Sequence, residues 1–212
     1  MADAYKVKEF VVEKTPEQEG FKLVNSGTID PYIAYWGSRR CRYIKGSYLY
    51  PIVPFSKLKE YSETRYQQAA SKKIITASMT TRYEACLDLK GEYIAGKSTT
   101  IIIGQDDVLK FLTAVINSKL ASFWLNIEFN SLKMSGGAIN IGKNELQLLP
   151  IPPYTVDICP YVSEILNTKA QDPLADTTSI ERKIDLLVYK LYRLTDDEID
   201  IVESYYNYKS KR

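Results

Sequence analysis

The chain has 212 residues, of which 45% are hydrophobic and 25% are charged, and its formal net charge at pH 7 is +2. These values are typical of a soluble globular protein, and a chain of this length can bury a core without disulfides or metals. Histidine is absent, which excludes the Ser-His-Asp triad, the Cys-His dyad and the HExxH zinc site. Composition alone therefore rules out most familiar hydrolase mechanisms.

The cysteines and the hydropathy pattern favour a cytoplasmic protein. Cys41, Cys86 and Cys159 are far apart and form no CxxC pair, so we expect free buried thiols and no metal site. The first ten residues lack the apolar segment of a signal peptide. The most apolar stretch, 108–129, is interrupted by charged residues, so we expect no membrane span.

Charge and strand signals divide the chain into a basic body and a mildly acidic tail. Residues 20–104 contain 13 Lys/Arg and 6 Asp/Glu, a net charge of +7, whereas residues 157–212 contain 8 and 11, a net charge of −3. In the body, Tyr and β-branched residues recur between Gly and Pro turn signals, which indicates a β-rich structure. The β-branched segments 73–77 and 98–103 are the best strands.

One long helix is expected after these strands. Apolar residues follow helical spacing from Val108 to Trp124, and Asp106 and Asp107 suit the first turn. The segment 134–138 ends this helix, and the prolines between 150 and 153 mark a boundary.

The tail is predicted to be helical. Thr178-x-x-Glu181 and Thr195-x-x-Glu198 are capping boxes, and an apolar stripe follows the first of them. We expect these helices to pack on the body or on a neighbouring domain. The predicted fold is α+β, with a connecting segment 1–20, a mixed or antiparallel β-rich body 21–153 containing one long packed helix, and a helical appendage 154–212.

Two short motifs suggest activities that their context does not support. Residues 91–98, GEYIAGKS, fit the phosphate-binding pattern GxxxxGK[ST], but that motif needs a helix after the loop and a strand sequence follows here. Residues 151–154, IPPY, resemble the NPPY motif of amino-methylating DNA methyltransferases. Ile151 replaces the Asn that binds the target amino group, so we expect a linker.

A third motif suggests a nuclease. Asp88-Leu89-Lys90 can be read as the end of a D…(D/E)xK signature, with Asp30 or Glu84 as a further metal ligand. Such short patterns often occur by chance, and this one lies in an expected turn.

Basic and hydroxyl side chains gather on the expected turns of the body, where segment 38–45 carries four positive charges and no negative one. Lysine is a point charge suited to phosphate, whereas the planar arginine side chain can bind guanine through two hydrogen bonds. We predict phosphate contacts by Lys72, Lys73, Lys97 and Lys133 and base contacts by Arg39, Arg40, Arg42 and Arg82. Further candidates are Lys45, Thr80, Thr81, Tyr83, Ser98, Thr99 and Ser135. A solvated basic surface is the alternative interpretation.

Several segments together resemble a known family in their order along the chain: KII at 73–75, MTTRYEA at 79–85, AGKSTT at 95–100, LTAVINSKL at 112–120, MSGG at 134–137 and LLPIP at 148–152. In this order they resemble the TaqI-like C-terminal specificity domain. That domain is the target-recognition domain of N6-adenine DNA methyltransferases, including fused type IIG restriction–modification enzymes. The resemblance covers residues 21–153, and residues 180–202 resemble the helices that follow this domain.

The resemblance implies that the chain grips double-stranded DNA and reads its sequence without catalysis of its own. A separate domain of the same or an associated polypeptide would hold S-adenosylmethionine and methylate the flipped adenine, and a nuclease domain, if present, would use Mg²⁺. The chain would then be a fragment of a longer enzyme or a free-standing specificity subunit. The alternative function is a protein-interaction module, in which the helix from Val108 and the tail from Ile180 dock another subunit.

Overall fold

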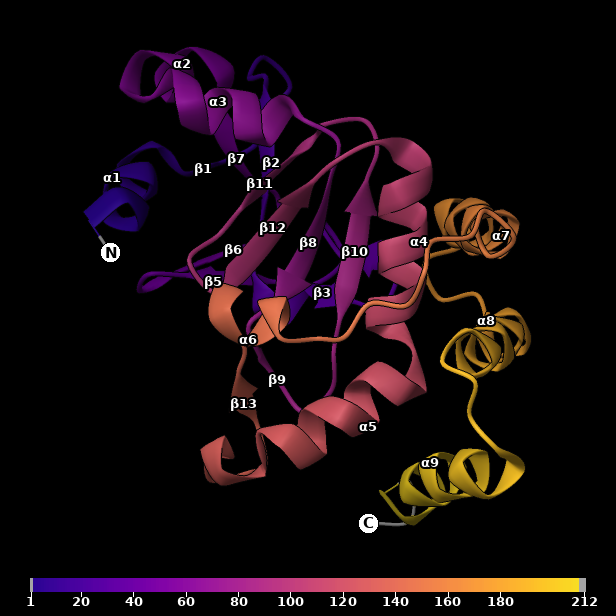
Figure 1. The fold of residues 1–212 in the computed structure, drawn as a ribbon. Helices are drawn as coiled ribbons and strands as arrows, with labels where there is room; N and C mark the ends of the chain where they lie inside the picture. Colours follow the sequence, from indigo (N-terminus) through magenta and orange to yellow (C-terminus); the bar gives the residue numbers. More distant parts are fainter. Residues whose placement is uncertain (1, 210–212) are drawn as a thin grey trace.

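The computed structural model describes residues 2–209, which form an α+β structure as the sequence predicts (Figure 1). The α-helices are α1 Ala2–Phe10, α2 Phe55–Tyr61, α3 Glu63–Ala70, α4 Asp106–Asn117, α5 Lys119–Glu128, α6 Lys143–Gln147, α7 Cys159–Gln171, α8 Thr178–Leu191 and α9 Asp196–Lys209. Two 3₁₀ turns are η1 Ser26–Thr28 and η2 Asn130–Leu132. The strands are β1 Val12–Glu13, β2 Gly20–Val24, β3 Ile29–Asp30, β4 Ile33–Ala34, β5 Cys41–Tyr43, β6 Gly46–Tyr48, β7 Pro51–Pro54, β8 Lys73–Ala77, β9 Met79–Thr80, β10 Ala85–Asp88, β11 Tyr93–Ala95, β12 Thr99–Ile103 and β13 Ile139–Asn140.

The strands form two main sheets and several short hairpin-like pairs. One sheet has the order β1-β7-β2-β11, in which β11 runs parallel to β2, and the other is antiparallel with the order β10-β8-β12. Figure 1 shows α2 and α3 near the first sheet, whereas α7, α8 and α9 form a row along the opposite side of the molecule. The mixed and antiparallel body is therefore confirmed, although α1, α2 and α3 were not predicted.

The central strand, β8, is buried along its whole length. Ile75 packs with Val24, Ile29 and Cys86 on one face of the sheet, and Ile74 packs with residues of α4 and α5 on the other. Successive side chains of a strand alternate between the two faces of the sheet, so Ile74 and Ile75 lie in different clusters and both faces of β8 are covered. The predicted strand at 73–77 is confirmed, and the predicted strand at 98–103 begins one residue later.

The prediction of one continuous helix from 108 to 124 is wrong, because the chain bends by 58° between α4 and α5. Ser118 adopts an extended conformation at this break, donates its hydroxyl proton to Val115 O at 2.7 Å and accepts a hydrogen bond from Ala121 N at 3.2 Å. Serine favours such caps because its hydroxyl replaces a backbone partner. Within residues 2–209 no single helix is long and apolar enough to cross a membrane; only the bent pair α4 and α5 would pass that test together.

The helical tail packs on the body. Phe111 and Val115 of α4 share a buried cluster with Ile158, Val162 and Ile165 near or on α7 and with Ile184 and Val188 on α8. The second capping box is confirmed, since Thr195 N donates to the Glu198 carboxylate at 2.8 Å and Glu198 N donates to the Thr195 hydroxyl at 3.4 Å. The first capping box is wrong: α8 begins at Thr178, its N-cap residue Thr177 makes no side-chain bond to the helix backbone, and the Thr177 hydroxyl instead donates to the Glu181 carboxylate at 2.6 Å.

An ion pair is buried at the N-terminal end of β8. Lys73 Nζ lies 2.6 Å from the Asp88 carboxylate, and their side chains are 1% and 2% exposed. Lys73 Nζ also donates to Ala69 O at 2.6 Å and Ser71 O at 3.0 Å, while Asp88 accepts the N–H groups of Glu92 at 3.1 Å and Tyr93 at 2.9 Å. Burial lowers the pKa of Lys73, and Asp88 opposes that fall.

This ion pair overturns the prediction that Lys73 contacts phosphate, since the ammonium group lies inside the protein. It also leaves the nuclease interpretation without its Asp88 ligand, because both oxygens of that carboxylate bind internal donors.

Breaking the ion pair is expected to destabilise the fold strongly. Lys73→Met leaves the Asp88 charge buried without its cation, which typically costs about 3–5 kcal/mol. Urea unfolding measures this loss, and Lys72→Met, on the exposed neighbouring residue, is the control. A loss below about 1 kcal/mol for Lys73→Met would contradict the central role of the pair.

Stability should also depend on pH through Asp185 of α8. Its carboxylate accepts Lys119 N at 2.9 Å, and burial raises its pKa from 3.8 to about 6. The folded protein therefore holds an extra proton between about pH 4 and pH 6, and the stability from this group is lost as the pH rises through that window.

Asp185→Asn, which stays uncharged and keeps an acceptor oxygen, should therefore gain about 2 kcal/mol relative to wild type between pH 4 and pH 7. Urea unfolding at both pH values measures the gain, and the exposed change Asp200→Asn should show none. An equal stability difference at the two pH values would contradict the prediction.

Candidate nucleic-acid interface

The turn η1 is hydrogen-bonded to two of the predicted DNA-binding segments, 38–45 and 97–99, and to Ser78, which lies just before a third. Asn25, which caps it, donates its side-chain amide to Arg42 O at 2.9 Å and accepts Ser98 N at 3.0 Å. Ser26 donates its hydroxyl to Ser98 O and accepts Ser78 N at 3.1 Å. The segments 38–45, 78–82 and 96–99 are thus tied to one point, and we call their combined exterior the η1 surface.

The close approach of the third segment depends on Gly96. A Cβ atom at this position would lie 2.8 Å from the Asn25 side-chain oxygen and 2.9 Å from Val24 O. Both distances are shorter than carbon–oxygen contacts allow, so only glycine fits. The AGKS sequence therefore serves this junction, and β12 follows it instead of a helix, which confirms that the phosphate-loop pattern lacks its structural context.

The hairpin of β5 and β6 lies at one side of the molecule (Figure 1), and its Arg42 and Lys45 side chains are exposed. Cys41 and Tyr43 are buried and Arg42 is exposed between them, as strand alternation requires. The two-residue loop, Ile44 and Lys45, has φ values of +37° and +60°. Both values are positive, as in a type I′ turn, although neither residue is the Asn or Gly that such turns favour. The tip is therefore strained and holds Lys45 outward.

Two arginines of the η1 surface are already paired. Arg39 contacts both oxygens of Asp30, at 3.1 Å and 3.0 Å, and its guanidinium carbon lies 4.3 Å from the centre of the Tyr35 ring. Asp30 raises the pKa of Arg39. Arg82 Nε lies 3.4 Å from Glu84, a carboxyl whose pKa is raised by burial. These arginines are fixed in position and have fewer free donors than their neighbours.

Four cations of the η1 surface have no ion-pair partner among the described residues: Arg40, Arg42, Lys45 and Lys97. All four side chains are exposed, and Lys97 Nζ lies 5.4 Å from the centre of the Tyr5 ring. They form the part of the η1 surface that is free to meet an anionic partner.

Several predicted contact residues serve the fold instead. Tyr83 is fully buried in the cluster with Phe129, and Thr80 donates its hydroxyl to Arg82 O at 2.6 Å inside the protein. Lys133 donates to Asn126 O at 3.1 Å and so stabilises the end of α5. Tyr83, Thr80 and Lys133 were predicted from residue type alone, and their burial or internal hydrogen bonds correct those assignments.

Lys72 lies at the opposite end of the sheet from the η1 surface. Lys72 precedes β8, whereas the η1 surface lies beyond the C-terminal end of β8. The Lys72 ammonium lies 2.7 Å from Asp106 at the start of α4. The structure therefore separates Lys72 from Lys97.

The remaining hydroxyl candidates are near the η1 surface. Thr81 is exposed, Ser98 is held through its backbone, and Thr99 donates its hydroxyl to Gly96 O at 2.8 Å. Ser135 is exposed on the loop before β13, which pairs with β9 next to Thr81. In the part of the chain that the structure describes, no cluster of three or more Asp, Glu, Cys or His side chains could hold a metal ion.

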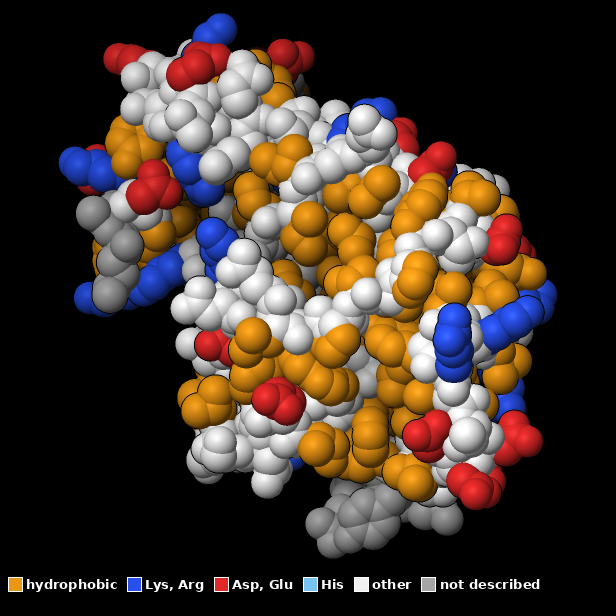
Figure 2. Space-filling model, viewed as in Figure 1, with side chains coloured by type: hydrophobic (Ala, Val, Ile, Leu, Met, Phe, Trp, Pro, Cys, Tyr) orange, Lys and Arg blue, Asp and Glu red, His pale blue; other side chains and the backbone are white. Residues whose placement is uncertain are grey.

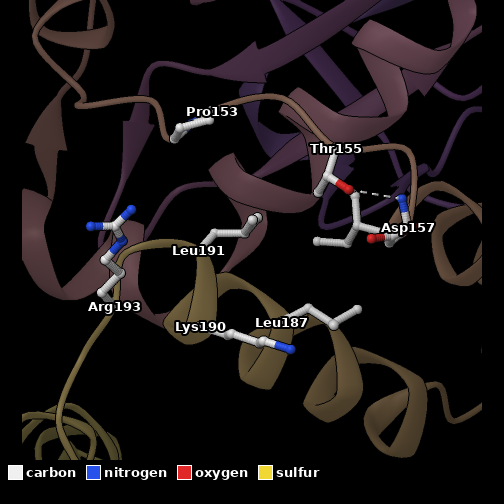
Figure 3. A pocket seen from close by; sticks show the side chains of 8 residues that line it. Pro153, Thr155, Asp157, Leu187, Lys190, Leu191 and Arg193 are labelled. Atoms are coloured by element: carbon white, nitrogen blue, oxygen red, sulfur yellow. Dashed lines mark hydrogen bonds between the residues drawn. The ribbon is translucent and has the colours of Figure 1, made fainter.

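A cavity of about 440 Å³ lies away from the η1 surface, between the connector 153–158 and α8 (Figure 3). Its apolar wall contains Leu187 and Leu191, and its cations are Lys190 and Arg193. Arg193, which follows the C-cap residue Tyr192 of α8, has φ +57°, a left-handed conformation that glycine usually supplies. The carboxylate of Asp157 also lines the cavity, so its wall carries both signs of charge.

Asn25 and Ser26, which hold the η1 surface together, were not predicted from the sequence. Their segment, Asn25-Ser26-Gly27-Thr28, has the composition of a turn, which was the available signal. Its partners lie up to 73 residues away, and nothing in the local pattern indicates them.

No protein-family model matches the chain, and no curated protein is significantly similar to it.

The strain at the hairpin tip can be measured separately from its charge. Lys45→Gly should raise the free energy of unfolding by about 1 kcal/mol, because glycine adopts positive φ without steric cost. Lys45→Ala also removes the charge but keeps the strain, so its stability should stay close to wild type. Equal stabilities of the two variants would contradict the strained turn.

Proposed function

We propose that the chain recognises double-stranded DNA through the η1 surface, as the target-recognition module of an adenine-N6 DNA methyltransferase or type IIG restriction–modification enzyme. One observation carries the proposal: four cations without ion-pair partners lie on two segments that hydrogen-bond to a single turn, and two of the cations lie on the β5–β6 hairpin. A solvated basic surface would not need its loops fixed to a common point.

The hairpin is the element best suited to enter a groove. The major groove of B-DNA, about 12 Å wide, admits a two-stranded ribbon. Arg42 points outward from this ribbon and Lys45 stands at its tip. Arg40 precedes the ribbon, so its planar donor group could reach a neighbouring base pair.

Phosphate contacts would come from the sides of the η1 surface. Lys97 is a point charge on a turn fixed by Asn25, and Thr81 and Ser135 add exposed hydroxyl donors. Such contacts orient the protein on the duplex and carry no sequence information. Arg39 and Arg82 would orient or support this surface, since their carboxylate partners already occupy part of their donor capacity.

In this proposal the chain has no catalytic residues. S-adenosylmethionine, and Mg²⁺ if a nuclease is present, would be bound by the methyltransferase and nuclease domains of the same or an associated polypeptide. An enzyme of this class acts on cellular DNA in the cytoplasm, where the three free, buried cysteines would stay reduced.

Binding to a randomised duplex library at two salt concentrations, with sequencing of the bound fraction, tests the proposal. An enriched motif whose affinity falls steeply with salt is the expected result, because readout is then added to phosphate contact. Absence of binding at low salt would overturn the proposal.

Substitutions should separate the two kinds of contact. Arg42→Ala should cost about 1–3 kcal/mol and relax the motif at one base pair, whereas Lys97→Ala should weaken all sequences alike and lower the salt slope by about 1. Lys72→Ala is the matched control and should change neither. Equal effects of Lys72→Ala and Lys97→Ala would contradict the location of the interface.

The second candidate function, protein docking, is favoured by a broad apolar face. Figure 2 shows apolar side chains across the region of α4, α6 and the connector that follows α6. The exposed members include Ile103, Val108, Leu148, Ile151, Tyr154 and Val156. Contiguous exposed apolar surface of this kind marks interaction sites. The apolar stripes of α4 and α8 are largely buried against each other, so this face would dock a partner.

A further inference from the structure

A groove on the apolar face lies beside the edge of the three-stranded sheet. Its cavity has a volume of about 380 Å³ and is lined by β12, α4, α6 and the connector at Leu149 and Ile151. Ile102 and Leu112 provide apolar walls, and Lys143 at the start of α6 provides a cation. Ile101 also lines the groove although its side chain packs in the cluster on the opposite face. The groove therefore reaches the backbone of β12.

The register of the sheet shows which backbone groups of β12 face outward. Ser78 N donates to Ser98 O at 3.0 Å, and Thr99 lies opposite Ala77. Hydrogen-bonded pairs recur at every second residue of an antiparallel ladder, so Thr100 and Ile102 bond to β8. Thr99, Ile101 and Ile103 must then direct their N–H and C=O groups away from β8.

The outward edge of β12 has no partner strand. Among residues 2–209, β8 is the strand that pairs with β12, and β12 ends the order β10-β8-β12. Proteins usually protect such an edge with charges, prolines or a bulge. The sequence of β12, Thr-Thr-Ile-Ile-Ile, contains none of these charged or proline residues. An edge of this composition is a template for strand addition.

We propose that β12 accepts an extended segment of a partner polypeptide as a fourth strand of this sheet. The outward backbone groups of residues 99, 101 and 103 would bind its main chain, and the groove would take its apolar side chains. Lys143, which has no ion pair among the described residues, selects an acidic residue in that segment. This inference does not depend on DNA recognition.

Hydrogen exchange followed by NMR tests the edge in the intact protein. Without a partner, the amides of Ile101 and Ile103 should exchange faster than those of Thr100 and Ile102. The probe is a capped peptide of alternating threonine and valine with one central glutamate. Its addition should slow exchange at Ile101 and Ile103 by at least about tenfold. Equal protection of all four amides in the free protein would overturn the proposal.

Two controls test main-chain pairing. Ile101→Pro removes one outward N–H and no bond to β8, a position where strands tolerate proline. It should weaken peptide binding about tenfold or more, whereas Ile101→Val should change it less than about twofold. The same peptide with N-methyl groups at alternate residues should not bind wild type, which keeps the test valid if the proline variant fails to fold.

Binding of the N-methylated peptide, or unchanged binding by a folded Ile101→Pro variant, would overturn strand addition. Concentration-dependent dimerisation in sedimentation that Ile101→Pro abolishes would overturn the partner segment in favour of a second copy of the chain. Duplex binding by Ile101→Pro should equal that of wild type, so failure of this inference is distinguishable from failure of DNA recognition.

Discussion

The buried ion pair between Lys73 and Asp88 is the constraint on which the central sheet depends. A charge in the interior is tolerated only when it is paired and fully hydrogen-bonded, and here the donors and acceptors come from four elements. The pair fixes the start of β8 against β10, α3 and the turn that leads to β11. Because β8 is central, its position also fixes Ile74 and Ile75 in the two clusters that hold the helices and the hairpins.

The N-terminal end of β8 is buried, whereas its C-terminal end leads to the surface of the protein. There the chain leaves the core at Ser78, and Ser26 and Asn25 connect the emerging loops by hydrogen bonds. A buried charge pair fixes one end of the sheet. At the other end, exposed charges lie on loops that are held by hydrogen bonds. Such a division places the residues proposed for DNA contact on a firm support. The open edge of β12 lies between these two ends, so a strand added there would reinforce the same sheet.

The elements that could be predicted from the sequence are those specified by residues close together in the chain. The β-branched run of β8 and the capping box before α9 both depend on residues within a few positions. The single long helix was wrong because Ser118, one residue in an apolar stripe, offers its hydroxyl in place of the next backbone bond. Lys72 and Lys73 were treated alike, yet Lys72 precedes β8 and is exposed beside Asp106, whereas Lys73 is the first residue of β8 and is buried against Asp88.

The sequence by itself determined which catalytic groups are missing: without histidine the chain lacks the common dyads and triads that depend on it, and basic residues cluster in its first half. Only the tertiary structure decided which of those basic residues are free. Arg40, Arg42, Lys45 and Lys97 remain unpaired, whereas Lys73 is buried and Lys72 is paired at the other end of the sheet. The physical reason is distance along the chain: hydrophobic periodicity is set by neighbouring residues, but a charge is satisfied by partners brought close by folding.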